Sequence, residues 1–130
     1  MKKLSKEIVE IIENNGFYAT KIEENEVDYF IELNQYTPLG EDWFFTIWFD
    51  GTNKDFIKQL YDFYENFDQN EEVKQYIKII GSYGVPNDVQ ALLDDQKWKK
   101  DKLEQLSQEL NNLIYLNPEI SGTKNSTNSL

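Results

Sequence analysis

The chain has 130 residues and a formal net charge of −11, and it contains neither histidine nor cysteine. Arginine is also missing, so the side chains that most often supply general bases, thiolate nucleophiles and zinc ligands are largely absent, and we expect no catalysis, metal or cofactor. One domain of this length buries roughly two-thirds of its unfolded surface, and an aromatic content of 15 % argues against disorder.

The N-terminal part predicts a short helix and two strands. Residues 4–15 place their apolar side chains on one helical face and end at Gly16, a typical helix stop. Strands are predicted over 17–24 and 26–34, the second because apolar and polar side chains alternate. Three glutamates in the helix stand where the apolar core of a signal peptide would lie, and no apolar run approaches the ~18 residues of a membrane span. The sequence therefore predicts a cytoplasmic protein.

A third strand is predicted over 42–50, after a turn at Thr37-Pro38-Leu39-Gly40 with proline at a favoured position. Residues 43–49 read Trp-Phe-Phe-Thr-Ile-Trp-Phe and are apolar on both faces. Such a pattern is typical of a central strand, so we expect strand 42–50 to be central and covered on both sides.

Helices are predicted over 53–67 and 71–80, and a long helix from Asn87 or Asp88 to about Leu116. Apolar residues of the long helix recur at 3–4 spacing, namely Leu103, Leu106, Leu110 and Leu113. This stripe could pack on the domain, or it could form the seam of a homodimer.

The element order α-β-β-β-α-α-α predicts an α+β fold, with helices packed on a small three-stranded antiparallel sheet and a long last helix. We expect a single domain over 1–117 and a disordered polar tail over 118–130.

Negative charge is concentrated in one block of the sequence. From Glu23 to Glu72 there are fourteen carboxylates and two lysines, a local charge of −12, whereas the other 80 residues carry +1. Such a field repels nucleic acid and membrane surfaces, and it attracts basic protein surfaces. We therefore expect a basic protein as the partner, with no direct binding to nucleic acid or membrane.

Rows of carboxylates in this block could imitate the charges of a nucleic-acid backbone. Helical geometry sets Asp55 and Asp62 two turns apart on one line, about 10 Å by helix rise, with Glu65 beside them. An aromatic anchor could be Trp48, on the mixed face of the third strand, or Trp98, among the lysines of the long helix. The predicted partner-binding residues are Glu41, Asp42, Asp50, Asp55, Asp62, Glu65, Asp68, Glu71, Glu72 and Trp98.

Other interpretations of the same residues stay open. The acidic block could serve solubility alone, the aromatic residues could simply be core, and a carboxylate pair could be a catalytic acid and base. The basic stretch Lys97 to Lys102 could pair with the acidic face of a second copy. Calcium loops at 68–72 and 50–55 are disfavoured because the glycine is absent or misplaced, so both segments are interpreted as helix caps.

A helix, a three-stranded meander and further helices with an acidic face resemble the small acidic anti-CRISPR and antirestriction inhibitors of phages and mobile elements. The segments that carry this resemblance are Tyr36-Thr37-Pro38-Leu39-Gly40-Glu41-Asp42-Trp43-Phe44-Phe45 and Asn66-Phe67-Asp68-Gln69-Asn70-Glu71-Glu72-Val73, so it covers about residues 36–73. The resemblance implies a non-catalytic inhibitor that occupies the nucleic-acid-binding groove of a host defence nuclease. It assigns no role to individual residues. An immunity protein that neutralises a basic toxin is the alternative.

Overall fold

The computed structural model describes residues 4–24, 29–80 and 89–116. Its elements follow the predicted order, so the α+β fold with a long last helix is confirmed. The predicted cap at residues 87 and 88 and the predicted tail lie outside the described residues. The elements are α1 (Lys6–Asn14), β1 (Tyr18–Glu24), β2 (Tyr29–Tyr36), β3 (Asp42–Phe49), α2 (Asn53–Asn66), α3 (Gln69–Ile80) and α4 (Val89–Leu116).

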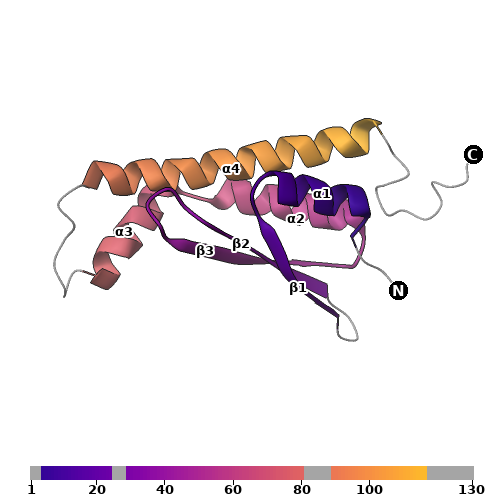
Figure 1. Ribbon diagram of the computed structural model, residues 1–130, viewed down its shortest axis with the longest axis horizontal. Helices are drawn as coiled ribbons and strands as arrows, with labels where there is room; N and C mark the ends of the chain where they lie inside the picture. The colour runs from indigo at the N-terminus through magenta and orange to yellow at the C-terminus, as the bar shows by residue number, and fades with distance from the viewer. Residues whose placement is uncertain (1–3, 25–28, 81–88, 117–130) are drawn as a thin grey trace, which may run out of the picture.

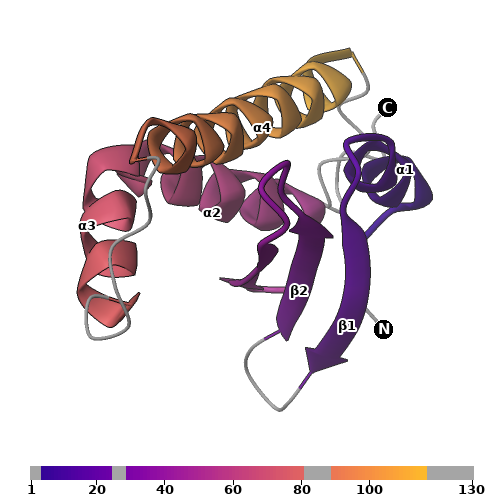
Figure 2. The same ribbon diagram turned by 60° about the vertical axis from the view of Figure 1, so that its left-hand side comes forward.

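The strands form one antiparallel sheet in the order β1-β2-β3, and the helices gather on one of its faces. Figure 1 shows α4 running across α1 and α2, with the sheet beneath them. Turned by 60°, Figure 2 shows α3 on one side of the molecule and β1 on the other. The second face of the sheet carries no helix among the described elements, so its side chains face outward.

The expectation that β3 is central and covered on both faces is wrong. In this sheet β2 is the central strand and β3 is an edge. Residues of β3 are alternately exposed and buried along its whole length, so only one face is covered. Consecutive strands of a meander lie side by side, which places the middle strand of the sequence in the middle of the sheet whatever the apolar content of the third. The outward aromatic residues of β3 are therefore exposed rather than buried.

Gly16 ends α1 as predicted and directs the chain into the sheet. Its φ of +89° is a left-handed conformation that favours glycine. The next amide, that of Phe17, donates to the carbonyl oxygen of Ile12 at 3.2 Å. A Cβ atom on Gly16 would lie 2.7 Å from Oε1 of Gln35, so the amide group of Gln35 would have to move to admit a side chain. The turn places Phe17 in the core, where its ring contacts Trp43 and Phe45.

The core lies between the sheet and the helices, and α4 supplies a large part of it. Leu103, Leu106 and Leu110 are fully buried, together with apolar residues of α1, α2 and the inner face of the sheet. The leucine stripe therefore packs on the domain, and these three side chains are not available for a dimer seam. Among the helices that the structure describes, not one is both long enough and apolar enough to cross a membrane.

A candidate interaction groove along strand β3

Three of the predicted site residues stabilise the N-terminal ends of helices. Asp50 Oδ1 accepts hydrogen bonds from the amide and the hydroxyl of Thr52, at 2.9 and 2.6 Å. Asp55 Oδ2 accepts the amide of Asp50 at 2.8 Å, and these contacts hold the entrance to α2. Asp68 Oδ1 accepts the amides of residues 70 and 71, the first turn of α3. The interpretation of both segments as caps is confirmed. These carboxylates stabilise the first turns of α2 and α3 through hydrogen bonds.

Glu41 belongs to a partly buried ion pair that fastens the turn before β3 to α4. Its Oε2 lies 2.9 Å from Nζ of Lys99, whose side chain is only 3 % exposed. One turn earlier on α4, buried Asp95 accepts the amide of Leu39 through Oδ1 at 3.1 Å. Two contacts from one face of α4 therefore hold the 37–41 turn, and Glu41 contributes to the fold as well as to the surface charge.

Neutralising Glu41 as Glu41→Gln is expected to lower the free energy of unfolding by about 1.5–3 kcal/mol, because it takes the anionic partner from a buried ammonium group. The matched change is Asp101→Asn, which neutralises the exposed Lys97–Asp101 pair and should cost less than about 0.5 kcal/mol. Urea unfolding of both variants measures the difference. Equal losses would mean that the Glu41–Lys99 contact does not tie the turn to α4.

Lys99 and Lys100, two of the four lysines in the basic stretch of α4, are engaged within the molecule. Lys100 Nζ donates to the carbonyl oxygens of Tyr64 and Phe67 at the C-terminal end of α2, the second at 2.8 Å. An ammonium group there interacts favourably with the helix dipole. Nζ of Lys102 lies 5.6 Å from the ring centroid of Trp98. Lys99 and Lys100 are therefore engaged within the fold, whereas Lys97 stays 63 % exposed in a surface pair with Asp101.

Trp98, predicted to be a partner anchor, is half-buried and packs on the core. Its ring meets Trp43 edge to face, with centroids 6.2 Å apart. Other exposed aromatic residues include two on the outer face of β3. Phe44 and Trp48 of β3 are 60 % and 53 % exposed, and Phe30 of β2 contacts Trp48 with centroids 4.5 Å apart.

The remaining predicted residues carry charge that is open to solvent. Four of them are exposed, and the side chain of Asp62 is 47 % exposed with Lys58 3.1 Å away, an exposed pair of small energy. The hydroxyl of Tyr61 bonds to the carboxylate of Glu65, which raises the pKa of that tyrosine. We call Asp42, Asp62, Glu65, Glu71 and Glu72 the open carboxylates.

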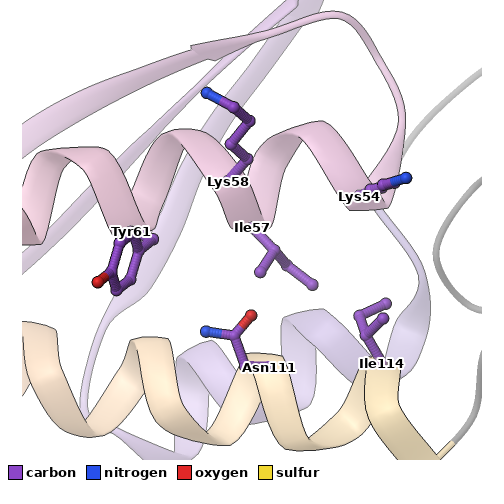
Figure 3. A pocket seen from close by; sticks show the side chains of 6 residues that line it. All are labelled: Lys54, Ile57, Lys58, Tyr61, Asn111 and Ile114. Carbon is purple, nitrogen blue, oxygen red and sulfur yellow. The ribbon is translucent and has the colours of Figure 1, made fainter.

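Both lysines of the acidic block line a hollow on another side of α2, between α2 and α4 (Figure 3). Lys54 and Lys58 stand at its rim, and Ile57 and Ile114 approach one another across it. The hollow is largely apolar and holds no carboxylate among its lining residues. Lys58 also forms an exposed ion pair with Asp62 one turn along α2, so positive and negative side chains meet on this helix.

Two adjoining hollows follow the free edge of β3. One lies beside Thr46, Ile47 and Trp48, and the other, with a volume of about 420 Å³, lies beside the first half of the strand. Phe63 and Asn66 of α2 line both, so the two join into one groove. We call it the β3 groove; its lining residues from outside β3 are Glu41, Gln59, Asp62, Phe63, Asn66, Phe67, Glu72 and Lys99.

The structure brings three of the predicted partner-binding residues, Glu41, Asp62 and Glu72, to this groove. Sequence reasoning missed its neutral members. Gln59 and Asn66 stand one turn to either side of Asp62 on the helix, a spacing that could have identified them. It also missed the free strand edge, which the meander order alone would have revealed.

Comparisons of this chain with protein-family models, with curated proteins and with solved structures found no match.

Proposed function

We propose that this chain is a non-catalytic inhibitor, encoded by a phage or mobile element, that binds the basic nucleic-acid-binding surface of a host defence nuclease in the cytoplasm. The open carboxylates would take the place of nucleic-acid phosphates on that surface. A protein that binds nucleic acid through many lysines and arginines would be attracted to such charges by the same electrostatic term.

The observation that carries this proposal is the exposure of the open carboxylates on the folded chain. The open carboxylates lie on the surface, whereas Lys99 is buried and Lys100 caps a helix. Lys99 pairs with Glu41, which is not one of the open carboxylates, and the exposed pair of Lys58 with Asp62 is worth little energy in solvent. Exposed charge of one sign speeds association with an oppositely charged surface and makes binding depend on salt.

The test is capture followed by competition. The immobilised chain is incubated at low salt with nuclease-treated host lysate, and retained proteins are then challenged with duplex DNA or guide RNA. We expect a basic nucleic-acid-binding protein to be retained at low salt, to be released by salt, and to be displaced by nucleic acid. Retention that is insensitive to salt would contradict the proposal.

Displacement separates the proposal from its alternative. An immunity protein that neutralises a basic toxin would also be acidic, and its complex would also weaken with salt. It need not compete with nucleic acid, because the toxin surface that it covers need not be a nucleic-acid site. A salt-sensitive complex that excess duplex DNA and guide RNA both leave intact would therefore favour the immunity protein.

A further inference from the structure

We propose that the β3 groove receives an extended basic segment of the partner, which pairs with the free edge of β3 as a fourth strand. The inference rests on the proposed function for the sign of the partner's charge. The inference goes beyond the proposed function by naming the contact surface and the conformation of the bound segment. Three features of the described residues carry it: an unprotected strand edge, a groove beside that edge, and the charge of the groove.

The backbone of β3 has hydrogen-bonding groups that point away from β2. Thr37 donates to the carbonyl oxygen of Glu41 at 2.9 Å, and the ladder continues from that pair in an unshifted antiparallel register. Bonded pairs alternate in such a ladder, so the amides and carbonyls of Phe44, Thr46 and Trp48 face the open edge. Within the described part of the chain, no strand pairs with them.

This edge lacks the devices that usually prevent strand addition. Natural edge strands are often protected by lysine, proline or a bulge. β3 has neither lysine nor proline, and its register with β2 is regular, whereas the irregular pairing of this sheet lies in β1. Its one charged residue, Asp42, stands at the start of the strand. An eight-residue edge of this kind can accept a strand of about 25 Å.

The groove sets which side chains the added strand would need. Alternate residues of that strand would point to the helix side, where Asp62 and Glu72 line the groove. The one cation among the lining residues, Lys99, is already paired with Glu41, and the exposed pair of Asp62 with Lys58 contributes little energy. The other residues would lie beside the exposed rings of Phe44 and Trp48 on the outer face. Lysine or arginine alternating with apolar residues fits both sides.

A second copy of this chain fits the edge less well. Pairing two β3 edges would bring two grooves together, each with Asp62 and Glu72, in chains that each have a net charge of −11. Like charges in close approach oppose association. Charge complementarity therefore selects a basic segment over self-pairing.

The test uses a synthetic peptide of about twelve residues in which lysine alternates with valine. Its matched control has the same sequence with methyl groups on the backbone nitrogens that would face β3, which keeps the charge and removes the donors. We expect the first peptide to bind at least tenfold more tightly. It should also slow hydrogen exchange at the amides of Phe44, Thr46 and Trp48, as followed by NMR.

A pair of protein variants gives a second measurement. Thr46→Pro removes an edge-facing amide that β2 does not use, whereas Thr46→Val keeps it. Only the proline variant should lose the preference for the unmethylated peptide, with circular dichroism showing that both variants fold. The peptide comparison needs no variant, so it decides the matter even if Thr46→Pro is unstable.

The outcomes separate this inference from the proposed function. Equal, salt-sensitive binding of both peptides would overturn strand addition and leave the proposed function intact. Selective strand addition, combined with captured partners that nucleic acid does not displace, would support strand addition and contradict the proposed function. A peptide-free dimer that Thr46→Pro converts to monomer would overturn the choice of a basic segment as the occupant.

Discussion

Replacing Leu106 by alanine is expected to lower the free energy of unfolding by about 2–5 kcal/mol, because it leaves a cavity in a packed core. Leu106 is fully buried in the cluster that joins α4 to the sheet. Chemical denaturation followed by tryptophan fluorescence measures the loss. If the leucine stripe belongs to the core of a single chain, the midpoint of unfolding should not depend on protein concentration.

Leu116→Ala is the matched control, because it makes the same chemical change on the same helix at a side chain that is 73 % exposed. We expect it to change stability by less than about 0.5 kcal/mol. Losses of equal size in the two variants would contradict the assignment of Leu106 to the core. A midpoint that rises with protein concentration would instead support the homodimer seam that the 3–4 spacing also allowed.

Reversing the charge of three open carboxylates, as Asp62→Lys, Glu65→Lys and Glu72→Lys together, is expected to weaken binding to the captured partner roughly 100-fold at low salt, about 2.7 kcal/mol. Attraction becomes repulsion at each site, while folding should be retained because these side chains lie at the surface, the least exposed of them, that of Asp62, at 47 %. Titration calorimetry at two salt concentrations checks both the affinity and its dependence on salt. Asp55 is left unchanged, since its reversal would also disrupt the entrance to α2.

The control for this triple variant reverses three exposed glutamates of α1, namely Glu7, Glu10 and Glu13. Both variants change the net charge by the same amount, so long-range attraction falls equally in the two. Only the first set lies on α2 and α3. A similar loss of affinity in both variants would mean that total charge, rather than its position, governs binding. It would then contradict a partner-binding surface formed by the open carboxylates.

Much of the fold could be predicted from local patterns because local physics decides those features. Gly16 stops α1 through a left-handed conformation, and Thr52 caps α2 by accepting the amide of Asp55. Alternation and 3–4 spacing located the strands and helices to within a few residues. The clustering of carboxylates is likewise a property of the sequence, and it made a basic partner the leading hypothesis.

The site was predicted less well, because exposure and pairing depend on contacts between distant segments. Glu41 and Lys99 are 58 positions apart, and only the packing of α4 on the turn joins them. Trp98 looked exposed amid lysines, yet it packs on the core, and its neighbours Lys99 and Lys100 contact the turn before β3 and the end of α2. The apolar third strand suggested burial on both faces, but helices cover only one face of the sheet.

The sequence by itself determined the order of the elements, their ends and the sign of the protein's field, since these follow from hydrophobic period, capping chemistry and the count of carboxylates. Tertiary structure alone decided which carboxylates stay open, which lysines are engaged, and that the edge of β3 borders a groove. A side chain's charge is local information, whereas its freedom to meet a partner depends on everything that folds against it.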